Sequence, residues 1–156
     1  MRRAFRMKGT MQLSEHFSLE ELTNSSTAQR KGIDNTPPNE EVMDHLRVLA
    51  SGLERVRHIL GASMHIDSGY RCPALNKAVG GVTTSAHTTG YAADFICPDF
   101  GTPLQIVKLL AEPHAMEFDQ MIQEGTWVHL SFAPTMRGEV LTASFTNGKA
   151  SYTKGV

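Results

Sequence analysis

The sequence lacks a strong excess of charge of either sign, and it has very few cysteines. Its 156 residues carry 15 Lys and Arg against 16 Asp and Glu, which gives a formal net charge of −1. No basic field of the kind that binds nucleic acid is present, so we expect no nucleic-acid partner. The two cysteines are Cys72 and Cys97. A small secreted scaffold usually carries more, so we favour two reduced, partly buried thiols over a disulfide.

Long apolar runs are also missing. Several basic residues occur among the first eight positions, but no apolar stretch follows them, so we predict neither a secretory signal nor a membrane span. We expect synthesis in a cytoplasm, with transport or release by another component if the target lies outside. We interpret residues 1–12 as a flexible tail and residues 13–156 as one domain, because a chain of this length suits a single core. We expect a monomer.

Helical patterns occupy the first part of the chain. Ser18 followed by Glu21 is a capping pattern, which predicts a short helix over about 18–24. After a loop broken by two prolines, Asn39 can cap a longer helix over about 40–60 that ends at Gly61. Apolar residues recur there at three- and four-residue steps, at Val42, Leu46, Leu49, Leu53, Val56 and Leu60.

Strand patterns prevail in the second part of the chain. Two more helices are expected there, one beginning at Pro73 and one capped by Thr102. The expected strands are a short one before the turn at Ser68–Gly69, one over 92–97 closed by Pro98, a hairpin over 118–132 and one over 139–145. Because the expected helices come mostly before the expected paired strands along the chain, we predict an α+β fold with a mostly antiparallel sheet.

The hairpin places unusual side chains on one face. With a turn at Gly125–Thr126, Glu124 lies opposite Trp127, and Ile122 lies opposite His129. Because side chains alternate along a strand, one face carries Gln120, Ile122, Glu124, Trp127, His129 and Ser131. This face therefore combines an imidazole with a carboxylate, which is uncommon for a face that only packs against a core.

The stretch "TTSAHTTGYAADFIC", residues 83–97, holds His87 and Asp94 seven residues apart. Threonines and Gly90 disfavour a helix, and a strand would put the pair on opposite faces. A loop that feeds a strand would allow His87 to turn back over the strand end. Together with His129, the pair supplies two imidazoles and a carboxylate, a set typical of catalytic zinc. From the residues alone, a chance pairing and a hydrogen-bonded core His129 stay open.

The segment "SAHTTGYAADF" resembles the S-x-H-x-x-G-x-A-x-D motif of the zinc D-alanyl-D-alanine carboxypeptidase family, which is grouped with lysostaphin-type and hedgehog-type domains. The segments "FSLEELTNSSTAQRKGIDNTPP", "SGYRCPALNKAVGG" and "FDQMIQEGTWVHLSF" also resemble its small single-domain branch, found in phages and bacteria. The resemblance runs from about Leu13 to Phe145. It implies a hedgehog/D-Ala-D-Ala-peptidase-like fold over 13–156, with one Zn²⁺ per chain on His87, Asp94 and His129.

The same resemblance implies roles for further residues. Arg71 matches an arginine that resembles a clamp for a substrate carboxylate, a role suited to the planar guanidinium. Ser85 matches the serine of the motif and is expected to contact the substrate or support a ligand. Trp127, from its place in the hairpin beside Glu124, is expected to shield the site, to pack on the substrate or to pack in the core. Many relatives carry an acid three residues before the last His ligand, where this chain has Thr126. Glu124 is the nearest carboxylate, and the hairpin puts it on the face of His129, so we expect it to be the general base. Asp119, which alternation points the other way, is the runner-up.

The implied function is zinc-dependent hydrolysis of peptide bonds in peptidoglycan stem peptides. The bond could be of the L-Ala-D-Glu endopeptidase or the D-Ala-D-Ala carboxypeptidase type, and we favour an endopeptidase that lyses or remodels cell wall. We expect action at the cell wall or periplasm, by a protein of phage, prophage or bacterial origin. Two alternatives stay open: a zinc-containing wall-binding module without turnover, and a structural component of a phage particle or secretion machine.

Overall fold

The structure is a computed structural model that describes residues 10–156. The predicted tail over 1–12 therefore lies mostly outside the described residues. Met11 and Gln12 lie against the first helix: the backbone N–H of Leu19 donates to the carbonyl of Met11 at 2.8 Å, and Gln12 forms a β-bridge with Ser18.

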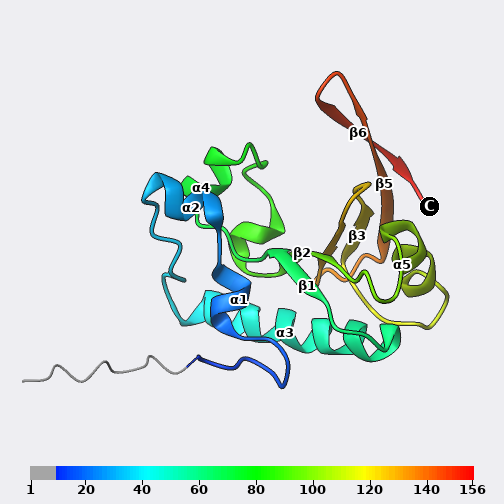
Figure 1. Cartoon of the computed structure of the whole chain (residues 1–156), viewed down its shortest axis with the longest axis horizontal. Coiled ribbons are helices and arrows are strands. Elements are labelled where there is room, and N and C mark those ends of the chain that lie inside the picture. The colour runs from blue at the N-terminus through cyan, green and yellow to red at the C-terminus, as the bar shows by residue number, and fades with distance from the viewer. Residues whose placement is uncertain (1–9) are drawn as a thin grey trace, which may run out of the picture.

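The helices lie mostly in the first two thirds of the chain (Figure 1). They are α1 (Leu19–Thr23), α2 (Ser26–Lys31), α3 (Glu40–Leu60), α4 (Pro73–Ala78), the 3-10 helix η1 (Ala86–Thr89) and α5 (Pro103–Leu110). The strands are β1 (His65–Ser68), β2 (Ala92–Ile96), β3 (Gln120–Gln123), β4 (Val128–Ser131), β5 (Glu139–Thr146) and β6 (Lys149–Lys154). Among these residues, no helix combines the length and the apolarity that crossing a bilayer requires.

The long helix α3 has the bounds that its apolar spacing predicts. The side chain of Asn39 accepts a hydrogen bond from the N–H of Val42, and Gly61 ends the helix in a left-handed conformation, with φ of 65°. Gly52, in the middle of the helix, is explained by close packing. A Cβ atom there would overlap the ring of Phe132, so only glycine lets this ring reach the helix.

The sheet is mixed, which corrects the prediction of a mostly antiparallel sheet. Its strand order is β1-β2-β4-β3-β5-β6, and β3 and β5 pair in parallel while the other neighbours are antiparallel. The reason is that β4 already has β2 and β3 on its two edges. The chain leaving β4 pairs at the free edge of β3, and because β5 runs opposite to β4, it is parallel to β3.

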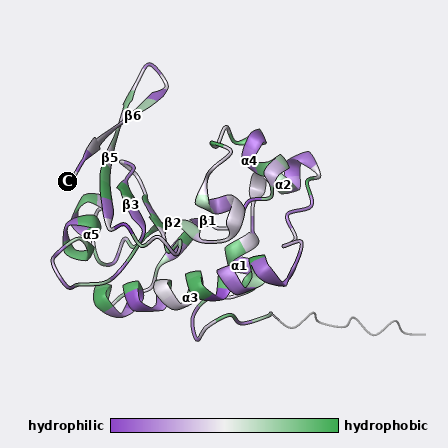
Figure 2. Ribbon diagram, turned by 180° about the vertical axis from the view of Figure 1, so that it is seen from behind, coloured by the Kyte–Doolittle hydropathy of each residue, from purple (hydrophilic) through white to green (hydrophobic). Residues whose placement is uncertain are grey.

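The two faces of the sheet have different tasks. The core face carries buried Ala93, Phe95, Met121, Val128 and Leu130, which join one apolar cluster with residues of α3 and α5. Figure 2 shows how apolar and polar residues alternate along α3, so its apolar side covers the core. On the opposite face, cross-strand pairing forms a row of Asp94, His129, Ile122 and Leu141.

Helix α2 and strand β6 were not predicted from the sequence, and neither was the 3-10 helix η1, which stands where a loop is expected. Helix α2 buries only Ala28, so its sequence has no apolar periodicity from which a helix could be predicted. Strand β6 is exposed along its whole length, but its signal was present. Asn147 and Gly148, both with positive φ, form the tight turn between β5 and β6, and Asn-Gly is the commonest sequence at such turns.

Candidate metal centre

His87 lies in η1, which turns the chain back over the start of β2. The sequence predicts a loop here, and the structure shows a single 3-10 turn. The hydroxyl of Ser85 accepts a hydrogen bond from the N–H of His87 at 3.2 Å, and Gly90 ends the turn with φ of 87°, a conformation that suits glycine. One short turn therefore brings His87 to Asp94, which neither a continuous helix nor a strand would do.

The chain that leaves β1 fixes His87 from the other side. The carbonyl of Gly69 accepts a hydrogen bond from Nδ1 of His87 at 2.7 Å. The N–H of Arg71 donates to the carbonyl of His87 at 3.0 Å. Gly69 itself packs tightly, because a Cβ atom there would overlap the carbonyl oxygen of Leu22. Ring and backbone of His87 are thus held by the same short segment.

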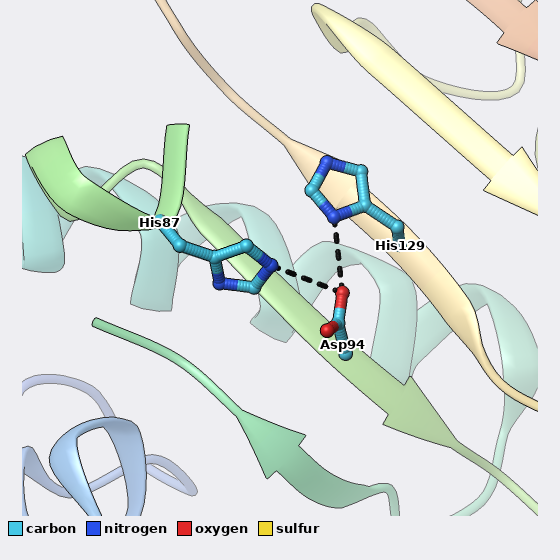
Figure 3. A group of neighbouring side chains, drawn as sticks. All are labelled: His87, Asp94 and His129. Atoms are coloured by element: carbon cyan, nitrogen blue, oxygen red, sulfur yellow. Dashed lines mark hydrogen bonds and ion pairs between the residues drawn. The ribbon is translucent and has the colours of Figure 1, made fainter. Parts of the chain in front are cut away.

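Asp94 on β2 and His129 on β4 complete the cluster (Figure 3). The Oδ1 atom of Asp94 lies 3.1 Å from Nε2 of His87 and 3.0 Å from Nδ1 of His129. One ligand atom from each of the three residues falls within 4.8 Å of the other two, a spacing that could hold a metal ion. The side chains of His87 and His129 are 1% and 11% exposed, and that of Asp94 is 16% exposed.

The protonation of His87 favours a cation at this point. A carbonyl only accepts hydrogen bonds, so Nδ1 of His87 carries the proton that it donates to Gly69. Burial lowers the pKa of His87, although Asp94 opposes that effect, so the ring is neutral and Nε2 offers a lone pair. Burial tends to raise the pKa of Asp94, but the two imidazoles together hold that pKa low. A lone pair therefore faces a carboxylate oxygen, an arrangement that a bound cation stabilises.

This donor set suits zinc. Two imidazole nitrogens and one carboxylate oxygen are ligands that zinc accepts at catalytic sites with one open position. The bond from Nδ1 of His87 to a backbone carbonyl is the outer contact that usually orients a metal-binding imidazole. The residues present therefore fit the metal that the sequence motif implies.

A cleft of about 720 Å³ surrounds the cluster. All of the residues singled out from the sequence line it: Arg71, Ser85, His87, Asp94, Asp119, Glu124, Trp127 and His129. Trp127 is half-buried at its edge. The strand pairing places Ile122 opposite His129, and the N–H of Glu124 donates to the carbonyl of Trp127 at 3.0 Å. The predicted hairpin register is therefore the one observed, and Glu124 shares the face of His129.

Glu124 and Asp119 have very different surroundings. Burial raises the pKa of Glu124; His129 lowers it and Asp94 raises it. Asp119 instead accepts hydrogen bonds from Thr135 and from the backbone and guanidinium of Arg137, at 2.7 to 3.1 Å. These bonds lower the pKa of Asp119 to about 2. The Asp119 carboxylate thus holds the segment before β5. Of the two carboxylates, Glu124 is the one whose raised pKa suits it to accept and release a proton.

Arg71 points into the cleft with incomplete pairing. Its Nε atom is buried and has no hydrogen-bond partner among residues 10–156. The loop at Gly80–Gly81 packs on this side chain, since a Cβ atom on Gly81 would lie 3.1 Å from Nη1 of Arg71 and would overlap Oδ1 of Asn76. A half-buried guanidinium with an unused donor is suited to a carboxylate ligand.

Some residues that shape the site carry no signal in the sequence. Buried Asn35 donates to the carbonyls of Thr23 and Tyr70 and accepts from the N–H of Cys72, which fixes the backbone around Arg71.

Cys72 and Cys97 are free thiols, as predicted. Phe145 on β5 and Tyr152 on β6 also line the cleft, and neither was singled out from the sequence.

Comparison with known proteins assigns the family. The model of the Peptidase M15 family matches residues 15–131, about three quarters of the chain, and the chain belongs to this family. No curated protein sequence matches it. The matched region contains the three clustered residues, Arg71 and Glu124, and it ends at the last residue of β4.

Proposed function

We propose that this member of the Peptidase M15 family is a zinc peptidase that hydrolyses peptide bonds in peptidoglycan stem peptides. The convergence of His87 Nε2, Asp94 Oδ1 and His129 Nδ1 beside an ionisable Glu124 carries the proposal. A zinc ion bound there would act as a Lewis acid on the scissile carbonyl and would acidify a water molecule. Family membership supports a peptidase, and the wall substrate is the part that we propose.

Glu124 is the residue that moves protons in this scheme. It lies on the face of His129 and lines the same cleft as the clustered residues, and its carboxylate takes a proton from the attacking water. It then delivers that proton to the leaving amine, so that the peptide bond breaks into a carboxylate and an amine. Burial raises the pKa of Glu124, which strengthens it as a base. Asp119 is unsuited to this role because Arg137 and Thr135 occupy its oxygens.

Arg71 positions the substrate. Its buried Nε and the rest of its guanidinium offer donors to a carboxylate of the stem peptide, and this pairing would satisfy the donor that the protein leaves unpaired. Ser85 acts through His87, because its hydroxyl holds the backbone of η1. Trp127 lies at the cleft edge, where it would shield the reacting bond from solvent. The protein would work as a monomer at the cell wall after release or export, as an endopeptidase that lyses or remodels it.

The decisive experiment is mass spectrometry of purified peptidoglycan after incubation with the zinc-loaded protein. New peptide termini would identify both the activity and the bond. Glu124→Gln should keep its zinc but lose roughly 10²- to 10⁴-fold in turnover, the usual contribution of a general base. Asp119→Asn, in the same cleft, is the matched control and should retain most of the turnover. Wall binding by the zinc-loaded protein without any new termini would refute the peptidase and leave a binding module.

A further inference from the structure

The β5–β6 hairpin has two unlike faces. Pairing of Ala143 with Tyr152 and of Phe145 with Ala150 puts these four side chains on one face. The other face holds Ser144, Ser151, Thr146 and Lys149. Phe145 and Tyr152 are 54% and 52% exposed, so the hairpin presents two large aromatic side chains on one side and small polar side chains on the other.

The aromatic face continues the face that carries the metal centre. Ile122 pairs with His129 on one side and with Leu141 on the other, so Leu141 lies in the row of the cluster. The parallel register ends at Gln123 and Thr142; the next residues along the chain are Glu124 and Ala143, and Ala143 pairs with Tyr152. Tyr152, Glu124 and Asp94 line the same cleft, and the charges of the two carboxylates add to burial in raising the pKa of the Tyr152 phenol.

Strand order puts this aromatic pair and Arg71 on opposite sides of the reaction centre. Arg71 follows β1 at one edge of the sheet, the clustered residues lie on β2 and β4 in its middle, and β5 and β6 form the other edge. In Figure 1 the hairpin rises from the sheet at the end remote from α1, α2 and α4. Arg71, Phe145 and Tyr152 nevertheless line one cleft, so a single extended ligand could contact all three.

We propose that Phe145 and Tyr152 form a substrate subsite that binds the amino-side, sugar-bearing end of the stem peptide. This inference rests on the proposed function. The proposal assigns the carboxylate held by Arg71 to the carboxyl side of the scissile bond, where the free carboxylates of the stem peptide lie, so that the opposite end of the cleft receives the amino side. In the wall, the amino end of the stem peptide is attached to a sugar, whose C–H face packs on aromatic rings while its hydroxyls reach polar tips such as the Tyr152 phenol.

The hairpin is suited to set specificity rather than to perform chemistry. It follows residue 131, where the family match ends, so the shared catalytic residues do not depend on it. Removing an aromatic side chain that a ligand covers commonly weakens binding by roughly 5- to 30-fold. That loss should appear only with ligands long enough to reach the hairpin.

The test compares two probes with the same stem peptide, one free and one still linked to its disaccharide. Binding is measured by calorimetry with zinc-loaded Glu124→Gln, whose turnover should be roughly 10²- to 10⁴-fold lower, so that the probes survive the measurement. The disaccharide-linked probe should bind this parent more tightly. Adding Phe145→Ala or Tyr152→Ala should weaken binding of the disaccharide-linked probe by roughly 5- to 30-fold and leave the affinity for the free peptide unchanged. Tyr152→Phe should retain most of the affinity for the disaccharide-linked probe, because the ring face remains.

Controls separate the subsite from folding and from the proposed function. Ser144→Ala and Thr153→Ala lie on the opposite face of the same hairpin and should bind both probes as the parent does. Bound zinc per chain should be equal in all variants. A preference for the disaccharide probe that survives Phe145→Ala and Tyr152→Ala would overturn the subsite, as would equal weakening of both probes. A parent that binds neither probe would overturn the proposed substrate itself.

Discussion

At the residue scale, Gly81 is where a single methyl group should disable substrate binding. A Cβ atom there would overlap Asn76 Oδ1 and would lie 3.1 Å from Arg71 Nη1, so Gly81→Ala must shift the Asn76 amide and would also press on the guanidinium. We expect a raised KM for stem-peptide hydrolysis with zinc content unchanged. Arg71→Lys should fail likewise, because an ammonium lacks the planar fork of the guanidinium.

The neighbouring glycine supplies the control for that prediction. Gly80 has φ of 76°, and a Cβ atom there would have no other atom within 4 Å, so Gly80→Ala strains the backbone without touching Arg71. Its KM should stay closer to the parent value than that of Gly81→Ala. Equal KM values for the parent and Gly81→Ala would show that Arg71 has room to move and does not depend on this loop.

The pKa of Glu124 gives a pH prediction at the same scale. The base must be ionised, so turnover should fall as pH decreases through its pKa. Burial raises that pKa above the ordinary value of 4.5, so the fall should begin at a higher pH than for an exposed glutamate. The acid limb of kcat/KM should be absent from the residual activity of Glu124→Gln. Bound zinc, measured at each pH, distinguishes this limb from metal loss, and an unchanged limb in the variant would exclude Glu124 as the base.

At the element scale, the Asp119–Arg137 pair joins the start of β3 to the segment that leads into β5. Asp119 has a pKa of about 2 against an ordinary 3.8. Because the folded-state pKa is the lower one, the carboxylate stabilises the fold above about pH 4, and this contribution is lost as pH falls toward about 2. The shift corresponds to about 2 kcal/mol in the free energy of unfolding.

Asp119→Asn should therefore unfold at lower urea concentration than the parent near neutral pH. The difference in unfolding free energy should shrink as both proteins are measured at decreasing pH. Glu112→Gln, an exposed carboxylate after α5, should show no such difference. A parent and an Asp119→Asn variant of equal stability near neutral pH would mean that Arg137 and Thr135 find other partners at no cost.

The elements also show what the sequence can predict. Helix α3 and the β3–β4 hairpin are predictable because apolar periodicity and a tight turn act over a few residues. The row that joins Asp94 to His129 depends on strand pairing between segments 35 residues apart, and there the family motif supplied what local pattern could not. Neither the local sequence pattern nor the family motif indicated Asn35 or Tyr152. Asn35 is placed near the site by tertiary packing, and Tyr152 is placed there by an exposed hairpin.

For the whole molecule, metal removal should lower stability as well as activity. The three clustered side chains come from η1, β2 and β4, so a metal ion would join segments that are otherwise linked by packing and hydrogen bonds. A ligand that binds only the folded state stabilises it by about 1.4 kcal/mol for each tenfold excess over its dissociation constant. Chelation should therefore lower Tm, and added zinc should restore it.

Substitution of the two clustered histidines tests whether the stabilisation comes from metal bound at this site. His87→Ala and His129→Ala should bind no zinc and should show the same Tm with zinc and with chelator. His58→Ala, at an exposed position of α3, should keep the zinc-dependent shift. Retention of one zinc per chain by both His87→Ala and His129→Ala would place the metal elsewhere in the protein.

The row of paired residues across β2, β4, β3 and β5 also governs which changes of chain length this fold can accept. Side chains alternate between the two faces, so one inserted residue inside β4 would turn His129 from the cleft into the core unless a bulge absorbed it. Insertions of odd and even length at Gly125–Thr126 should differ for the same reason, as parity decides which face each later residue takes. A change of length at the Asn147–Gly148 tip would alter the face of Tyr152 but not that of any clustered residue, because all three precede the tip in the chain. Divergent copies of this chain should therefore vary in length there first.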